Sequence, residues 1–202
     1  MHDRAIAGYV ADAELLIAPY EALSSEEIFA PVAHLLPTFP ARIAEIGAGT
    51  GRDAAWFAGR GHHVLAVEPV DAFREAGRKL HPSQHISWLG DALPGLSRTL
   101  ARSERFDLVT LIGVWQHLDS EQQREAIPSL AALVAPGGHL ILSVRHGPGA
   151  PTRPCFPSRP EDVIADSAAS GLRLVFRRET ESIQAANRAN GVTWTWLAFR
   201  RG

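Results

Sequence analysis

The sequence predicts an α/β protein whose core is a mainly parallel β-sheet. First, an apolar run at residues 43–46 leads through a glycine-rich turn into an amphipathic segment at 54–58, the pattern of strand, turn and helix. Second, further apolar runs of strand length follow along the chain, separated by segments with helical spacing. Third, 202 residues with 46% hydrophobic content are enough for one globular domain, 1–202, with a full α/β core.

Two helices are expected before the glycine-rich turn, and they would form an N-terminal helical cap at residues 1–40. They lie at residues 10–18 and 25–36. Ser24 precedes the second helix and Glu27 follows three places later, which is the sequence of a capping box. Pro37 ends this helix. The simplest role for such a leader is to cover one edge of the sheet.

The turn at residues 44–53 reads AEIGAGTGRD and carries glycine at three alternate positions, 47, 49 and 51. These glycines let the backbone turn tightly and leave no Cβ between it and a flat ligand. A dinucleotide fingerprint needs glycine at the place held by Arg52, and a phosphate loop needs a Gly-Lys-Ser/Thr sequence that this turn lacks. Pyrophosphate is therefore the weaker expectation for a ligand, and a tight bend without a ligand is the structural alternative.

A helix is expected at residues 52–60, ending at Gly61, followed by a short buried strand at 63–67 that ends in Glu68. In a βαβ unit, an acid at this point reaches both hydroxyls of a ribose with its two oxygens. Alone, Glu68 could be a surface carboxylate at a strand end. Its spacing from the glycine-rich turn favours a nucleoside-binding role.

The alternation of helices and strands continues to the end of the chain. Helices are expected at 70–80, 120–134 and 161–170, and strands at 86–89, 106–112, 139–144, 172–176 and 192–199. We expect Pro128 to break the second of these helices early, and residues 136–138 (PGG) to form a turn before the next strand. The segment 146–160 contains five of the 14 prolines, which predicts a loop on the ligand-bearing edge.

The pattern acid-x-Gly-x-Gly-x-Gly that begins at Glu45, with Glu68 and an acid after the third strand, Asp91, resembles the class I S-adenosylmethionine (AdoMet) dependent methyltransferases over residues 43–200. The resemblance implies a Rossmann-like, doubly wound sheet of seven strands in the order 3-2-1-4-5-7-6, with the last strand antiparallel. It implies AdoMet as cofactor, with Asp91 on the adenine amine; alone, Asp91 could equally cap a turn. The implied cofactor-binding residues are Glu45, Gly47, Ala48, Gly49, Gly51, Arg52, Glu68, Pro69, Asp91, Ala92, Val114 and Trp115.

In relatives of this kind the N-terminal leader often folds over the cofactor, which makes Tyr9 and Tyr20 candidate lid contacts. Aromatic residues on amphipathic helices more often serve packing. A helix N-terminus favours an anion, so Arg52 and the start of its helix are candidates to receive the methionine carboxylate. The segment 146–160 is either a mobile surface loop or a substrate lid, with three cationic side chains in reach of a carboxylate: Arg145, His146 and Arg153.

The tip of the fourth strand, residues 113–118 (GVWQHL), resembles the small-molecule branch of these enzymes, in which a Val-x-x-His-hydrophobic pattern is frequent. His117 is the candidate catalytic residue, because an imidazole with a near-neutral pKa can take a proton from an attacking hydroxyl or amine. The favoured alternative is a structural or cofactor-shaping role, since many relatives keep this histidine whatever their substrate. Asp119 or Ser120 would also suit the cap of the following helix.

Composition limits the partners. A formal charge of −2 and a pI near 6.5 provide no long-range field for nucleic acid or an anionic membrane, and they leave a local basic patch open. A small-molecule substrate is what the resemblance implies. The single cysteine, Cys155, suits a reducing cytoplasm, and acids inside the first apolar stretch argue against a signal peptide or membrane span. No metal is expected, because His62 and His63 are adjacent and point apart in a strand. Both a monomer and a homodimer stay open.

The sequence thus predicts an AdoMet-dependent methyltransferase that acts on a small molecule by in-line displacement. A non-catalytic AdoMet-binding protein is the first alternative, because the general base is not assigned with certainty. An NAD(P)-dependent oxidoreductase is a weaker one, since Arg52 interrupts the GxGxxG pattern and Lys79 is the only lysine available for a Tyr-Lys pair.

Overall fold

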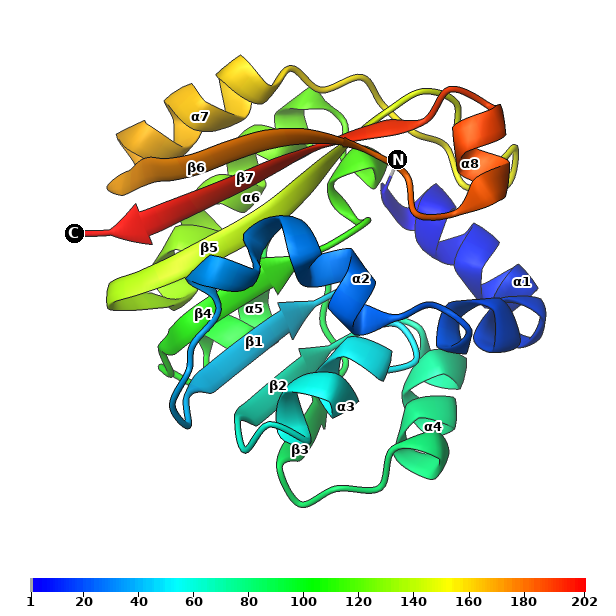
Figure 1. Cartoon of the computed structure of the whole chain (residues 1–202), viewed down its shortest axis with the longest axis horizontal. Helices are drawn as coiled ribbons and strands as arrows, with labels where there is room; N and C mark the ends of the chain where they lie inside the picture. Colours follow the sequence, from blue (N-terminus) through cyan, green and yellow to red (C-terminus); the bar gives the residue numbers. More distant parts are fainter. Residues whose placement is uncertain (1) are drawn as a thin grey trace.

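The computed structural model describes residues 2–202 and shows seven strands in one sheet, in the order β3-β2-β1-β4-β5-β7-β6 (Figure 1). The strands are β1 (Arg42–Ile46), β2 (His63–Val67), β3 (Ile86–Leu89), β4 (Phe106–Leu111), β5 (Val134–His146), β6 (Leu172–Glu181) and β7 (Thr193–Arg201). The pairs from β3 to β5 are parallel, whereas β7 runs antiparallel to β5 and β6. The predicted Rossmann-like fold, strand order and antiparallel last strand are confirmed.

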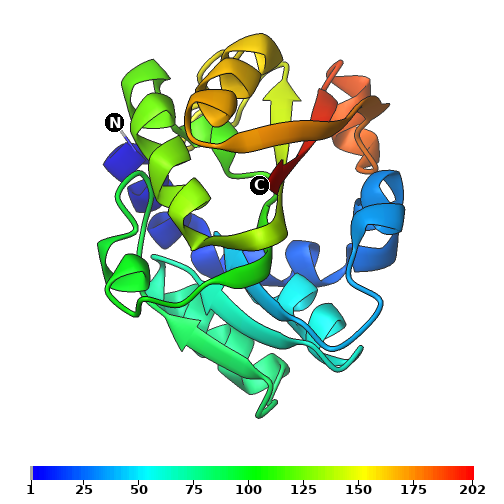
Figure 2. The ribbon, with the colours of Figure 1, turned by 90° about the vertical axis from the view of Figure 1, so that its left-hand side faces the viewer.

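Helices cover both faces of the sheet (Figures 1 and 2). They are α1 (His2–Glu21), α2 (Ser25–Phe29), the 3₁₀ helix η1 (Ala30–Leu35), α3 (Arg52–Ala58), α4 (Asp71–Leu80), α5 (Ser97–Leu100), the 3₁₀ helix η2 (Trp115–His117), α6 (Ser120–Leu133), α7 (Pro160–Ala169) and α8 (Ala185–Ala189). One apolar cluster joins α2, η1 and α3 to the sheet, and another joins α5, α6 and α7 to it. The helix α1 packs instead on α4.

The central strands are apolar along most of their length because helices bury both of their faces. In β1, Ile43 and Ala44 are fully buried, and β1 lies between β2 and β4 with its residues in parallel register. Glu45 thereby stands opposite Ala66 of β2 and Thr110 of β4. The carboxyl ends of β1, β2 and β4 therefore meet at one edge of the sheet, where open α/β sheets bind their ligands.

The N-terminal helices differ from the prediction. The helix α1 begins at His2 and is longer than the expected 10–18, and the expected helix at 25–36 is divided into α2 and η1. Pro31 lies in the first turn of η1, where it donates no backbone hydrogen bond and so favours a break after α2. One half of the predicted capping box is present, since the Ser24 hydroxyl accepts the Glu27 N–H at 3.3 Å.

The prediction that Pro128 breaks the helix at 120–134 is wrong. The helix α6 continues through Pro128, because Ile127 and Leu130 on either side are fully buried against the sheet and hold the helix in place. The turn expected at 136–138 lies inside β5, which begins at Val134, five residues before the predicted strand. In this stretch Gly137 has φ +76°, and the pairing of β5 with β4 shifts register between Phe106 and Leu108.

Candidate functional site

A cavity of about 530 Å³ lies at the carboxyl ends of β1, β2 and β4. This volume is within the range of small-molecule and cofactor sites. Its lining comes from the glycine-rich turn, the ends of β2 and β3, the tip of β4, the helix α1, the proline-rich segment and the β6–β7 hairpin. In Figure 1 the helices α1 and α8 lie at this same end of the sheet. The lining thus combines residues from both ends of the chain with the glycine-rich turn at residues 44–53.

The glycine-rich turn fits closely against the β4 tip. Gly47 has φ +75°, and a Cβ at this position would lie under 3.0 Å from Cγ2 of Val114. Gly49 has φ +55°, and its N–H donates to the Glu68 carboxylate at 2.8 Å. Left-handed φ values of this kind are costly for residues with a Cβ. Gly47, Ala48 and Gly49 line the cavity, whereas Gly51 packs against the Trp88 indole and does not.

Glu68 stands at the end of β2 with both carboxylate oxygens engaged. One oxygen accepts the Gly49 N–H and the other accepts the Val70 N–H, each at 2.8 Å. Only 5% of Glu68 is exposed, and this burial raises the pKa of its carboxyl to about 7, although the two backbone hydrogen bonds lower it. Each oxygen retains a second lone pair, so the carboxylate can accept two more hydrogen bonds from a ligand.

Glu45 lines the cavity from the end of β1. It is buried, and its Oε2 atom has no hydrogen-bond partner. Burial and the neighbouring Asp53 carboxylate raise the pKa of Glu45 well above its usual value, while the Arg52 guanidinium lowers it. An unpartnered buried carboxyl oxygen is costly for the folded protein, and a ligand group that donates a hydrogen bond to it would remove that cost.

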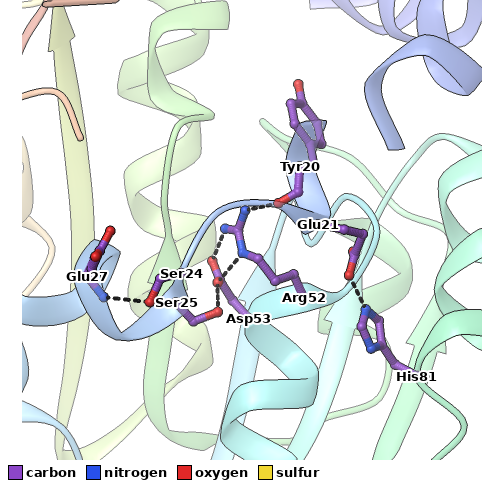
Figure 3. A network of polar contacts seen from close by, with 8 residues as sticks. All are labelled: Tyr20, Glu21, Ser24, Ser25, Glu27, Arg52, Asp53 and His81. Atoms are coloured by element: carbon purple, nitrogen blue, oxygen red, sulfur yellow. Dashed lines mark hydrogen bonds and ion pairs between the residues drawn. The ribbon is translucent and has the colours of Figure 1, made fainter. Parts of the chain in front are cut away.

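Arg52 is already paired within the protein, which changes the expected role of its side chain. Its guanidinium donates to both oxygens of Asp53, at 2.8 and 2.9 Å, and to the backbone carbonyl of Tyr20 at 2.8 Å (Figure 3). The Ser25 hydroxyl donates to the same Asp53 carboxylate at 2.6 Å. In the same view the Glu21 carboxylate lies 3.0 Å from Nε2 of His81. These contacts fasten the junction of α1 and α2 to α3 and α4.

Asp91 lines the cavity just after β3 and also caps a helix. Its Oδ1 accepts the Ala92 N–H at 2.9 Å, and its Oδ2 accepts the Thr99 N–H and hydroxyl, each at 2.7 Å. Both interpretations offered by the sequence, a ligand contact and a local cap, are thus compatible with its position. Pro69 and Ala92 line the cavity beside it.

The tip of β4 divides its residues between cavity and core. Val114, Gln116 and His117 line the cavity. Trp115 does not: it is 1% exposed, belongs to the core cluster, and donates its indole N–H to the Ser158 hydroxyl at 3.0 Å. Of the residues that the resemblance implies for cofactor binding, Gly51 and Trp115 are therefore the two that lie outside the cavity lining.

His117 is fixed by hydrogen bonds on both ring nitrogens. Its Nδ1 faces the Pro154 carbonyl at 2.9 Å, and a carbonyl oxygen can only accept, so Nδ1 carries the proton in this arrangement. Its Nε2 faces the Tyr9 hydroxyl at 2.9 Å. Burial raises the pKa of Tyr9 well above its usual value, so this hydroxyl is protonated and can donate to Nε2. The Pro154 carbonyl and the Tyr9 hydroxyl together hold the His117 ring in one orientation.

The helix α1 and the segment 147–159 contact each other over the cavity, and we call them together the cavity cover. Arg153 forms an ion pair with Asp12 and lies 5.2 Å above the ring centroid of Tyr9. The Thr152 hydroxyl donates to Asp12 at 3.0 Å, and Gly8 packs against the Thr152 carbonyl. Tyr9, Tyr20 and Arg153 line the cavity from this cover.

The other two predicted cations have different positions. His146 bonds to the Thr195 hydroxyl at 2.8 Å on β7 and does not line the cavity. Arg145 does line it, beside Trp194 and Asn187. Sequence reasoning missed Trp194 and Asn187 as site residues. Trp194 alternates with Trp196 in a strand and gave only a strand signal, and Asn187 lies in the short helix α8, for which we found no signal.

No helix among the described residues is long and apolar enough to cross a membrane. Residues 2–202 also contain no group of three or more His, Cys, Asp or Glu side chains that could hold a metal ion.

A seven-stranded sheet in this order, with a cavity at the carboxyl ends of its first, second and fourth strands, defines the class I methyltransferase fold. The sequence model of the methyltransferase domain family matches residues 20–201, so the chain belongs to this family. An uncharacterized methyltransferase of Mycobacterium tuberculosis is 32% identical over 108 residues, which are 54% of this chain and 41% of the relative. Nodulation protein S of Rhizobium tropici is 28% identical over 104 residues, 50% of this chain and 42% of that protein. The chain thus matches less than half the length of these relatives.

Solved structures show the same fold at low identity. The 1,6-didemethyltoxoflavin-N1-methyltransferase of Burkholderia thailandensis, bound to 1,6-didemethyltoxoflavin and S-adenosylhomocysteine, has a TM-score of 0.76 and 20% identity, covering 98% of this chain and 88% of that one. The N-methyltransferase NodS of Bradyrhizobium japonicum, bound to S-adenosylhomocysteine, has a TM-score of 0.67 and 22% identity, covering 87% of this chain and 86% of that one.

Proposed function

We propose that this protein transfers the methyl group of AdoMet to a small-molecule acceptor bound in the same cavity. The observation that carries the proposal is the hydrogen bond from Gly49 to Glu68, which joins the glycine-rich turn and the acid after β2 into one wall of the cavity. Family membership supports AdoMet as the cofactor. The solved relatives that hold S-adenosylhomocysteine support it as well, and one of them also holds a small acceptor.

The residues of the cavity fit AdoMet in chemical type. Glu68 has lone pairs left for the two ribose hydroxyls, and Asp91 is available to the adenine amine. The unpartnered Oε2 of Glu45 suits the ammonium group of the methionine part. Arg52 is committed to Asp53 and Tyr20, so we assign it to holding the N-terminal junction in place rather than to direct binding of the methionine carboxylate.

When bound, AdoMet supplies a methyl group that is already electrophilic and a thioether leaving group that needs no proton. The main task left to the chain is orientation of the acceptor, which can contribute on the order of 7–11 kcal/mol of barrier lowering. The cavity cover, formed by α1 and the segment 147–159, acts as a lid that holds the acceptor in the cavity and keeps water out. Tyr9 holds the Nε2 atom of His117, so His117 takes a proton from an acceptor only after Tyr9 moves away.

Calorimetry with AdoMet, S-adenosylhomocysteine and NAD tests the cofactor. We expect binding of the first two and none of NAD. Tight NAD binding would support an oxidoreductase instead. A second assay follows S-adenosylhomocysteine release with a panel of small hydroxyl-, amine- and thiol-bearing acceptors. Binding of AdoMet with no release on any acceptor of the panel would favour a non-catalytic AdoMet-binding protein.

A further inference from the structure

Three arginines line the cavity, and their partners separate one from the other two. Arg52 is paired with Asp53 and Arg153 with Asp12. Within residues 2–202, Arg145 has no carboxylate partner within 4.0 Å; its Nη2 atom donates to two neutral acceptors, the Pro148 carbonyl at 2.7 Å and the Asn187 amide oxygen at 3.3 Å. Its Nε atom is buried and has no hydrogen-bond partner. The side chain therefore retains uncompensated positive charge and a free donor.

Strand register places Arg145 in a row of side chains on one face of the sheet. Arg145 of β5 pairs with Trp194 of β7, and Trp194 pairs in turn with Thr180 of β6. Opposite residues of paired strands point to the same face, and all three line the cavity. The Arg145 guanidinium lies 5.4 Å from the centroid of the Trp194 ring. The end of the cavity formed by the β6–β7 hairpin thus combines a flat aromatic surface with a cation.

The same indole connects this cation to the tip of β4. The Cη2 atom of Trp194 lies 3.9 Å from the point where a Cβ on Gly113 would stand. Gly113 lines the cavity next to Val114, which contacts the glycine-rich turn. A planar ligand lying along the Trp194 ring would reach the β4 tip with one end and Arg145 with the other. No side chain fills the space at Gly113 itself, which leaves room for the reacting end.

We propose that the β5–β7 side of the cavity is an acceptor subsite for a planar aromatic carboxylate, with its ring on Trp194 and its carboxylate on the Arg145 guanidinium. The inference rests on the proposed methyl transfer and specifies the acceptor class for that same site. A guanidinium binds a carboxylate through charge-assisted, often paired hydrogen bonds, and such a partner would satisfy the buried Nε donor. The acid that β6 contributes to the lining, Glu181, is exposed.

The test is calorimetric titration of the S-adenosylhomocysteine-loaded protein with matched probes: benzoate and 2-naphthoate, their neutral amides, and cyclohexanecarboxylate as a non-planar acid. We expect the aromatic acids to bind about tenfold or more tighter than their amides, since they differ in one charge-assisted contact. They should also bind more tightly than cyclohexanecarboxylate. In Arg145→Met the preference for acid over amide should disappear, and Arg145→Lys should restore part of it. The control is Arg178→Met, which removes the same charge from an exposed position of β6 outside the cavity.

Binding of S-adenosylhomocysteine to each variant is measured first, which keeps this inference separate from the proposed function. Failure of the wild-type protein to bind S-adenosylhomocysteine would refute the proposed function. Normal cofactor binding together with equal affinity for acids and amides, or with no binding of any aromatic acid, would overturn the subsite. An acid preference that survives in Arg145→Met would overturn it as well.

Discussion

The raised pKa of Glu68 predicts that cofactor affinity depends on pH near neutrality. The carboxyl has a pKa of about 7 because burial penalises its charged form. Ribose hydroxyls donate hydrogen bonds, and they bind the carboxylate more strongly than the protonated acid. Affinity should therefore rise as pH increases through 7, which is the direction expected when the binding form is the deprotonated one.

The size of this effect follows from the ionised fraction of Glu68. With a pKa of about 7, roughly one-eleventh of the carboxyl is ionised at pH 6 and roughly ten-elevenths at pH 8. Apparent affinity scales with the binding-competent fraction, so S-adenosylhomocysteine should bind about tenfold more weakly at pH 6 than at pH 8. Calorimetric titrations across this range measure the change directly.

Two variants make the pH experiment decisive. Glu68→Gln removes the titrating group while keeping its shape, so its affinity should be lower at pH 8 and should change little between pH 6 and 8. Glu179→Gln removes an exposed carboxyl of β6 outside the cavity and should keep the wild-type profile. A flat profile in the wild-type protein, or an unchanged slope in Glu68→Gln, would show that Glu68 does not contact the cofactor.

Three further substitutions test the remaining parts of the site. Asp91→Ala should weaken AdoMet binding by about 1.5–3 kcal/mol in calorimetry, whereas Thr99→Val, which loses only a cap contact, should change it little; equal effects would assign Asp91 to the cap alone. Gly47→Ala should lower the free energy of unfolding by about 1–3 kcal/mol, measured in urea, because its φ is +75° and its Cβ would overlap Val114; wild-type stability would contradict the close fit seen here. His117→Ala should slow S-adenosylhomocysteine release on the acceptor panel with a smaller effect on AdoMet affinity, and full activity would exclude His117 as a base.

The parts of the site that depend on local sequence could be predicted. Glu68 follows a short apolar strand, and the glycines at 47 and 49 follow another, so period and turn chemistry were enough to place all three at one edge of the sheet. The strand order came from the resemblance to a family. Glu68 and the two glycines could be predicted because all three belong to one βαβ unit, in which the sequence spacing determines the geometry.

The parts that depend on tertiary packing could not be predicted. Trp115 lies in the β4 tip between the cavity-lining residues Val114 and Gln116. Its indole nevertheless turns into the core and reaches Ser158, more than forty residues away in the chain. Arg52 was expected to face an anionic ligand, but the adjacent Asp53 takes its guanidinium. Pro128 is tolerated inside α6 because burial on both sides outweighs one lost hydrogen bond. For Trp115 and Pro128 the deciding contacts lie outside the local pattern, whereas the partner of Arg52 is the next residue in the sequence.

The Trp88 indole has a consequence for how this protein can change over evolutionary time. A Cβ at either Gly51 or Gly77 would lie under 3.0 Å from the ring atoms of Trp88, so one aromatic side chain excludes larger residues at two distant positions. Replacing Trp88 would relieve only part of this constraint, because Gly51 has φ +78° and a Cβ on Gly77 would also lie 2.6 Å from the Thr50 carbonyl oxygen. Both glycines should therefore stay fixed even in a library that varies residue 88.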